Sequence, residues 1–425
     1  MKKLILSVLG LSFICVSAQF KIEIYAEDTF AKQKVFIYTQ SGSKDFIISH
    51  ADKTKEKWEV NIPKEYKGMM RAYFPENAQS VSFISENEDI KIKLGSDLNK
   101  IKKIQYIDKA NKKWEEMIAL EQQKGNILPI LLQIKNFYKD NDQFYPALKD
   151  EILRLEKTEI KVEKDSFLEF YLEAMKYANG GDGVFSTKDY KSFLMNSNEM
   201  LEASSLIKPI LINFLRSIPR ESLTQNVDRL LEELNLETNR GQVVLSELLS
   251  VFDTYGLTEE KERYYKQASA LACSVNKNLE TSISAIKNTS IGAKFQDHSF
   301  TSNVKNTKAK KISDVIADKK LVLFWSSACP HCVSELPIIL ENYGELKQKN
   351  IEIIAFSLDS DALSYEEKTT ALPWINDAEL KGWRSSYVEK YNISATPTYY
   401  VLDSKGRIID KPANFSVFLK TINAK

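Results

Sequence analysis

Two cysteines that could do chemistry stand close together in the C-terminal part of the chain. Cys329 and Cys332 are separated by Pro330 and His331. The apolar run 321–325 before them predicts a buried strand, and the helical spacing after them predicts that the pair opens a helix. Cysteines three apart in a first helical turn can close a disulfide, and the free N–H groups there stabilise a thiolate on the first sulfur. We therefore predict a redox-active pair in which Cys329 is the nucleophile and Cys332 resolves the mixed disulfide.

Two other uses of the pair are less compatible with the sequence. A zinc site needs four ligands, but there is no second Cys-x-x-Cys, and His50 and His298 are the histidines besides His331. A purely structural disulfide across so short a loop would remove little entropy from the unfolded chain. The sequence thus favours redox chemistry without a metal ion or another cofactor.

Two further residues bear on this chemistry. An imidazole at His331, beside Cys329, would stabilise the thiolate and therefore the reduced form, which makes the disulfide a better oxidant. Cys273 lies in a stretch with helical spacing, where it is expected to be a small buried hydrophobe. The alternative for Cys273 is a third thiol that exchanges with the pair.

Composition sets the wider frame. The chain has 425 residues, of which 43% are hydrophobic, so two or three domains with packed cores are expected. Its 59 basic and 58 acidic residues leave a net charge of +1. This balance gives no electrostatic reason to expect a nucleic-acid partner.

The first residues have the composition of a targeting segment. Residues 1–18 combine a basic start, an apolar stretch and a small-residue end, which predicts a cleaved signal peptide and an exported, periplasmic protein. Cys15 would suit a lipid anchor, but Phe13 and Ile14 precede it where small residues would be needed. No later apolar run has the length of a membrane span, so stable membrane insertion is not expected.

The period of the apolar positions divides the rest of the chain into three predicted domains. Residues 19–100 contain alternating positions such as Phe20, Ile22 and Ile24, which predict an antiparallel β sandwich or barrel. Residues 101–285 carry apolar side chains at helical spacing and predict an α-helical domain. Residues 286–425 alternate strand and helix, with a hairpin near the end, and predict a small α/β domain.

The segment FWSSACPHC, residues 324–332, resembles the active-site turn of the thioredoxin superfamily. The chain from about residue 291 onward is similar to the TlpA/ResA-like branch of exported thiol-disulfide oxidoreductases. Trp325 lies four residues before the first cysteine, as the family's tryptophan does, and joins Pro330 and His331 as a residue expected to tune the couple. Pro337 falls where the family kinks its helix.

Two other parts of the site follow from the same resemblance. Residues 395–409, ATPTYYVLDSKGRII, resemble the family's cis-proline loop, which implies that Thr396 and a cis Pro397 hold an extended substrate segment. An ordinary trans proline before a strand is the alternative. Leu323 stands where thioredoxin has a buried aspartate, and Glu335, where the ResA-like branch has a glutamate, is the candidate acceptor of the Cys332 proton. A surface glutamate that only favours the helix N-terminus is the alternative for Glu335.

Residues 84–94, ISENEDIKIKL, loosely resemble part of the β domain that precedes thioredoxin-like domains in exported proteins of Bacteroidetes-type bacteria. Together the resemblances imply an enzyme that reduces or exchanges disulfides of proteins, with a membrane thiol carrier as electron donor. The Pro-His dipeptide resembles that of DsbA-type oxidases, which leaves the direction of electron flow open.

Two alternatives belong to other classes of function. The chain could be a binding or assembly module whose C-terminal domain is a docking element. Peroxide reduction is disfavoured because the Pro-x-x-x-Thr/Ser-x-x-Cys pattern is missing. A homodimer also stays open, because long helical arms beside redox domains can mediate dimerisation.

Overall fold

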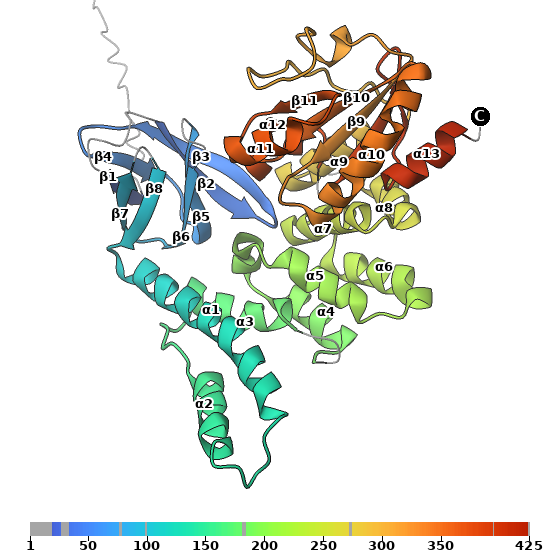
Figure 1. Cartoon of the computed structure of the whole chain (residues 1–425). Helices are drawn as coiled ribbons and strands as arrows, with labels where there is room; N and C mark the ends of the chain where they lie inside the picture. Colours follow the sequence, from blue (N-terminus) through green and yellow to red (C-terminus); the bar gives the residue numbers. More distant parts are fainter. Residues whose placement is uncertain are drawn as a thin grey trace, which may run out of the picture. The chain divides into compact units, whose positions relative to one another are not determined.

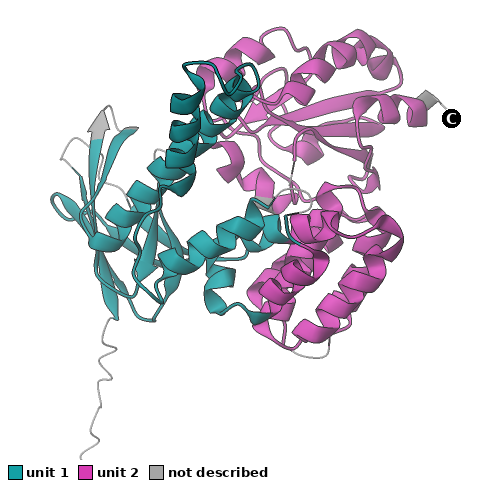
Figure 2. Ribbon diagram, turned by 90° about the horizontal axis from the view of Figure 1, so that it is seen from below, with its two compact units in different colours: residues 1–185, 196–210 teal, residues 186–195, 211–425 magenta. Residues whose placement is uncertain are grey.

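The computed structural model describes residues 19–26, 34–75, 79–97, 100–180, 184–271, 274–393 and 395–423. Contacts divide the chain into two compact units (Figure 2). The N-terminal unit comprises residues 1–185 and 196–210, and the C-terminal unit comprises residues 186–195 and 211–425. The predicted signal peptide and Cys273 lie outside the described residues.

Two four-stranded sheets form the β part of the N-terminal unit, drawn in blue and cyan in Figure 1. The first has the strand order β4-β1-β7-β8 and the second β3-β2-β5-β6. Apolar side chains from both sheets, among them Ile22, Trp58 and Phe74, are buried in one core, as the alternation in the sequence predicts. The strands span Phe20–Ala26 (β1), Lys34–Ser41 (β2), Lys44–Asp52 (β3), Lys57–Ile62 (β4), Lys67–Phe74 (β5), Gln79–Glu86 (β6), Ile90–Asp97 (β7) and Lys100–Tyr106 (β8).

One strand pair differs from the wholly antiparallel arrangement that the sequence suggested. Strands β1 and β7 are parallel, whereas the other pairs in the two sheets are antiparallel. Between β1 and β7 the chain forms β4 and the four strands of the second sheet. No tight turn therefore joins β1 to β7 and fixes their relative direction.

Two helices pack on the second sheet of the N-terminal unit. Trp114 and Met117 of α1 and Phe167 of α3 form a buried cluster with Met69 of β5 and Ile84 of β6. These apolar contacts attach the first part of the helical region to the β sheets. The helical segments of this unit are Lys109–Lys135 (α1), Tyr145–Lys157 (α2), Phe167–Ala178 (α3) and the 3-10 turn Glu199–Ser204 (η2).

A buried asparagine adds polar contacts to this junction. Asn111, near the start of α1, accepts the N–H of Ile84 at 2.7 Å and donates its amide to the Ile84 carbonyl at 2.9 Å. Asn111 and Ile84 are both completely buried. The side chain therefore supplies both hydrogen bonds that a neighbouring strand would otherwise give to β6 at this residue.

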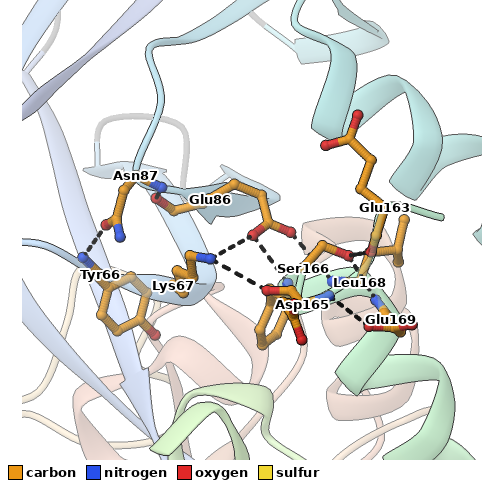
Figure 3. Close-up of polar contacts among 11 residues, drawn as sticks. Tyr66, Lys67, Glu86, Asn87, Glu163, Asp165, Ser166, Leu168 and Glu169 are labelled. Atoms are coloured by element: carbon orange, nitrogen blue, oxygen red, sulfur yellow. Dashed lines mark hydrogen bonds and ion pairs between the residues drawn. The ribbon is translucent and has the colours of Figure 1, made fainter.

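Figure 3 shows a second polar link, between the end of β6 and the first turn of α3. The Glu86 carboxylate accepts the N–H of Phe167 at 3.0 Å and that of Leu168 at 3.3 Å. The Lys67 ammonium lies 4.0 Å from it. Burial raises the pKa of Glu86 above its usual value, although the two N–H groups and Lys67 act in the opposite direction. The carboxylate gives partners to helix N–H groups that have none within the helix.

We expect Glu86→Ala to lower the free energy of unfolding of the N-terminal unit by about 1–3 kcal/mol, because two N–H groups lose their acceptor. Glu86→Gln should be milder, since its amide oxygen can still accept one of them. Because the folded-state pKa is raised, the stability that this carboxyl contributes is present at low pH and falls as the pH rises from 4.5 through the folded-state pKa. Thermal unfolding between about pH 4 and about pH 8 should therefore show Glu86→Gln gaining stability relative to the wild type.

Glu156, an exposed carboxylate on α2 of the same unit, supplies the matched control. Glu156→Gln should follow the pH profile of the wild type. If the unfolding temperatures of Glu86→Gln and the wild type differed by the same amount at every pH in this range, burial would not raise the pKa of the Glu86 carboxyl.

A five-stranded sheet forms the centre of the C-terminal part of the chain, with the order β11-β10-β9-β12-β13. Strands β9, β10 and β11 are parallel, and β12 and β13 are antiparallel to their neighbours. The predicted buried strand is thus central as β9, and the predicted hairpin is formed by β12 and β13. The strands span Lys319–Trp325 (β9), Ile351–Ser357 (β10), Ile375–Ala378 (β11), Thr398–Asp403 (β12) and Ile408–Asp410 (β13).

Helices cover both faces of this sheet. Ile339 of α10 and Phe418 of α13 pack in one core with Leu323 of β9, whereas Tyr387 of α12 packs with Phe324 on the opposite face. Successive residues of β9 therefore point into two different cores, as in a strand buried on both sides. The helices are Pro330–Gln348 (α10), Ala362–Thr369 (α11), Ser386–Lys390 (α12) and Phe415–Asn423 (α13).

The remaining helices are the green to yellow segments of Figure 1. Helix α7 packs against α6, α8 and α9, and its Val244, Leu248 and Phe252 are buried. These helices span Thr187–Asn196 (α4), Ile207–Arg216 (α5), Leu223–Leu234 (α6), Asn239–Thr254 (α7), Thr258–Ser269 (α8) and Lys277–Thr289 (α9).

The predicted fold class is confirmed: β sheets are followed by a helical region and a C-terminal α/β domain. The boundaries at residues 100 and 285 stay predictions; strand β8 continues to Tyr106, and helices occur in both units. Within the described ranges, no helix combines the length and the apolar character needed to cross a membrane.

Candidate functional site

The two cysteines lie where the central strand leads into a helix. Strand β9 ends at Trp325, α10 begins at Pro330, and Cys329 is the N-cap residue between them. Cys329 and Cys332 form a disulfide with their Cα atoms 5.3 Å apart. The backbone N–H of Cys332 also points at Cys329 Sγ, at a distance of 3.2 Å. The predicted strand-turn-helix context of the pair is therefore confirmed.

The two sulfurs differ in access to solvent. Cys332 is only 2% exposed and belongs to the core between the sheet and α10, whereas Cys329 is half-buried. Pro330 and His331 are exposed. A large partner can thus approach Cys329 far more easily than Cys332.

The position of Cys329 also favours its ionisation. Its sulfur takes the place of an N-cap acceptor and faces the N–H of Cys332 in the first turn of α10. Positive potential at a helix N-terminus stabilises an anion there, so a thiolate would be favoured on Cys329. The predicted tuning residues flank this position: Trp325 is fully buried in the same core as Cys332, and the exposed His331 begins the helix with Pro330.

The loop before β12 lies directly against the disulfide. The peptide bond between Thr396 and Pro397 is cis, as predicted. The Thr396 carbonyl oxygen is 3.3 Å from Cys329 Sγ. Thr396 and Pro397 are both partly exposed. The loop thus offers backbone groups beside the more accessible sulfur.

Glu335 has a partner that the sequence did not indicate. Its carboxylate accepts a hydrogen bond from the Tyr399 hydroxyl, two residues after the cis proline. Burial, reinforced by this contact, raises the pKa of Tyr399, so the hydroxyl stays protonated and acts as a donor. Glu335 is half-buried, one turn beyond Cys332. It is therefore not a merely solvent-exposed helix residue.

Strand alternation in the sequence indicates the face of the sheet on which Tyr399 lies, although not its partner. Tyr399 and Val401 point into the core that contains Cys332, whereas Tyr400 and Leu402 point into the opposite core. The side of the sheet that a hydroxyl reaches is fixed by this alternation, because successive residues of a strand face opposite ways. Leu323 is buried in the same core, in agreement with the departure from thioredoxin noted at this position.

Asp359 is a second site residue that no motif in the sequence marks. It follows β10, and its carboxylate accepts a hydrogen bond from the Ser326 hydroxyl at 2.8 Å. Pairing of β9 with β10 brings the two strand ends together, since parallel neighbours end at the same edge of the sheet.

Metal-ligand geometry is not found in the part of the chain that the structure describes: no group of three or more His, Cys, Asp and Glu residues there could hold an ion. His50 is in β3 of the N-terminal unit, and His298 is in the segment before β9. His298 packs edge-on against Phe356 and Tyr387.

Part of the chain is similar to known proteins. Residues 318–408 match the family model described as thioredoxin-like. The thiol-disulfide oxidoreductase ResA of Oceanobacillus iheyensis is 29% identical over 104 residues, which cover 23% of this chain and 50% of that protein. ResA of Bacillus cereus is 24% identical over 115 residues, which cover 25% of this chain and 63% of that protein.

Among solved structures, the thioredoxin domain of a thiol-disulfide oxidoreductase from Bacteroides vulgatus matches with 21% identity and a TM-score of 0.29, over 32% of this chain and 96% of that one. The chain spans about half the length of the first curated relative that it matches. The chain therefore carries a thioredoxin-like domain over residues 318–408 and is similar to the TlpA/ResA-like thioredoxin-like proteins.

Proposed function

We propose that the protein is an exported thiol-disulfide oxidoreductase that reduces or exchanges disulfides of protein substrates. The observation that carries this proposal is the Cys329–Cys332 disulfide, placed at the N-terminus of α10 and against the Thr396 carbonyl. An accessible sulfur that is favoured as a thiolate, next to a buried second thiol, has the arrangement that disulfide exchange requires.

The proposed reaction begins with the reduced pair. The Cys329 thiolate attacks one sulfur of a substrate disulfide, the substrate S–S bond breaks, and the departing substrate thiolate takes a proton from water. Glu335 then accepts the Cys332 proton, and the Cys332 thiolate attacks Cys329 Sγ. The mixed disulfide breaks, and the second substrate thiolate takes up this proton. Two electrons have passed from the protein to the substrate disulfide. One of the two protons that the substrate takes up comes from Cys332 through Glu335, and the other comes from water, which balances the proton that Cys329 released when it ionised.

Thr396 and Pro397 are proposed to hold the substrate during this exchange. An extended segment of a substrate protein can pair with exposed backbone groups, as a strand does at a sheet edge. The Thr396 carbonyl already lies 3.3 Å from Cys329 Sγ, so a segment bound there would present its own disulfide to the nucleophile.

The oxidised pair must be reduced again before the next turnover. We propose a membrane thiol carrier as the donor, because residues 1–18 have the composition of a signal peptide that directs export to the periplasm. Such a donor supplies two electrons through its own dithiol, and no cofactor is required in the exchange. Protein thiols and disulfides are the other proposed partners.

Insulin reduction by the complete mature chain, with dithiothreitol as donor, is the test of this function. We expect the protein to accelerate precipitation of the insulin B chain well above the rate with dithiothreitol alone. A rate equal to that background, with a correctly folded protein, would refute the proposal.

The direction of electron flow is tested by the reduction potential of the couple. A potential near about −270 mV would support a reductase, and one near about −120 mV would support a DsbA-like oxidase. The exposed His331 between the cysteines favours the second outcome, because a protonated imidazole there stabilises the thiolate. The similarity to ResA favours the first.

We expect Glu335→Gln to slow insulin reduction by about tenfold near neutral pH, because the amide cannot accept the Cys332 proton. The defect should diminish at alkaline pH, where Cys332 ionises without a protein base. Tyr399→Phe is the matched comparison: it removes the hydrogen-bond donor to Glu335 but keeps the carboxylate. A Glu335→Gln defect that is the same at every pH would contradict the proton-transfer role.

A further inference from the structure

A buried carboxylate lies beside the turn that carries the nucleophilic cysteine. Asp359, just after β10, is 5% exposed. Its Oδ1 accepts hydrogen bonds from the Ser326 hydroxyl at 2.8 Å, the Ser327 N–H at 2.9 Å and the Ser327 hydroxyl at 2.8 Å. Its Oδ2 accepts the Ser357 hydroxyl at 2.7 Å. A charged group removed from water needs such partners, and here three of the four come from the two residues that follow β9.

Hydrogen bonds within the turn connect Asp359 to Cys329. The Ser326 hydroxyl that donates to Asp359 also lies 3.3 Å from the N–H of Ala328, which can donate to it. The Ser326 carbonyl accepts the N–H of Cys329 at 3.1 Å. Asp359 is thus connected to the backbone of the nucleophile through a single residue. The helix N-terminus stabilises a Cys329 thiolate only while Cys329 keeps its N-cap position. Hydrogen bonds that fix this turn therefore also fix the environment of the sulfur.

Asp359 is itself held from two sides. Its backbone N–H donates to the Ser357 hydroxyl at 3.0 Å, and its carbonyl oxygen accepts the N–H of Gly382 at 3.3 Å. Ser357 is the last residue of β10 and is completely buried. The carboxylate therefore extends from the buried end of β10 toward the turn.

The negative charge of Asp359 affects the Cys329–Cys332 couple in addition to the hydrogen bonds of its carboxylate. The titratable groups that the described contacts bring to the pair are His331 and Glu335 on α10, Tyr399 on β12 and Asp359 after β10. A negative charge near a thiol disfavours the thiolate, whereas a protonated imidazole favours it. Asp359 and His331 consequently act in opposite directions on the couple.

We propose that Asp359 is a positioning residue for Cys329, which fixes the Ser326–Ser327 turn through its hydrogen bonds and biases the couple toward the reducing side through its charge. This inference rests on the proposed function. A residue outside the cysteine motif would then control both the position of the nucleophilic Cys329 and the direction of electron flow.

Two substitutions in the complete mature chain separate the charge from the hydrogen bonds. Asp359→Asn removes the charge but keeps an oxygen that can accept from Ser326 and Ser327, whereas Asp359→Ala removes both. The control is Asp361→Asn, which changes a carboxylate that caps α11 by accepting the N–H of Ser364 at 2.7 Å. The readouts are the pH dependence of Cys329 alkylation, the equilibrium of the couple with glutathione, and insulin turnover.

For Asp359→Asn we expect a lower pKa of Cys329 and an equilibrium constant shifted about three- to tenfold toward the dithiol. Tenfold corresponds to about 30 mV for this two-electron couple. Asp359→Ala should show the same shift and a further loss of insulin turnover of about tenfold, because the turn is no longer fixed. If Asp359→Asn had higher insulin turnover than Asp359→Ala, the hydrogen bonds rather than the charge would be what positions the turn.

Ser326→Ala provides a test that leaves the buried charge in place. It should slow insulin turnover without lowering the pKa of Cys329, since it removes the Ser326 hydroxyl that bonds to Asp359 but leaves the two hydrogen bonds from Ser327 and the charge in place. If Asp359→Asn and Ser326→Ala both matched Asp361→Asn in pKa, equilibrium and turnover, the inference would be wrong.

The glutathione equilibrium needs no substrate protein, which distinguishes this inference from the proposed function. A wild-type chain without insulin activity would refute the proposed function and leave the shift measurable. An active wild type with an unchanged Asp359→Asn couple would refute only the role of Asp359.

Discussion

Cys329→Ser is expected to abolish reduction of insulin disulfides, with turnover below about 1% of the wild type. A serine hydroxyl does not ionise near neutral pH and cannot form a mixed disulfide. Cys332 cannot replace the lost sulfur, because it is 2% exposed and lies in the core beneath α10. Turnover of dithiothreitol-reduced protein with insulin, at equal concentrations of variant and wild type, measures the effect.

Cys273→Ser is the matched control for this experiment, since it removes a thiol while both cysteines of the motif remain. It should retain wild-type turnover if Cys273 is only a small hydrophobe. A loss of activity in Cys273→Ser would instead support the third-thiol alternative. Normal turnover by Cys329→Ser would show that the nucleophile is a different residue.

Cys332→Ser is expected to convert the enzyme into a trap. Cys329 can still attack a substrate disulfide, but the buried residue that should break the mixed disulfide has lost its sulfur. With oxidised insulin in excess, at least about half of the variant should carry a covalent adduct. Mass spectrometry of the intact protein, before and after dithiothreitol, measures this fraction.

The double variant Cys329→Ser/Cys332→Ser should form no adduct, which excludes other thiols as the point of attachment. Absence of any adduct with Cys332→Ser would favour the binding-module alternative, in which the thioredoxin-like domain serves for docking. The Cys332→Ser experiment therefore distinguishes an oxidoreductase from a binding module. It also distinguishes the attacking sulfur of Cys329 from the resolving sulfur of Cys332.

Local patterns predicted the parts of the site that are close together in the sequence. The apolar run before Cys329 and the helical spacing after Cys332 place the pair at a helix N-terminus, and the cis bond before Pro397 follows from the resemblance of its loop. These features depend on strand and helix periods and on one short motif, all of which can be recognised without tertiary contacts.

Contacts between distant strands could not be predicted in the same way. Asp359 reaches the turn after β9 only because β10 pairs with β9 in one particular register, and Tyr399 reaches Glu335 only because β12 pairs on the other side. The parallel pairing of β1 with β7 has the same origin, since no local turn sets it. Register and strand order depend on the whole sheet, so the sequence of either partner alone does not contain them.

The paired hydrogen bonds of Asn111 have a consequence for how the protein behaves in a crowded compartment. Strand β6 is at the edge of its sheet, and an open edge offers its N–H and C=O groups to strands of other molecules, which is a common start of aggregation. At Ile84 both groups are already bonded to Asn111, and α1 covers the position. At this position of β6 one helix residue thus blocks strand addition, as an extra strand would, without presenting a new edge of its own.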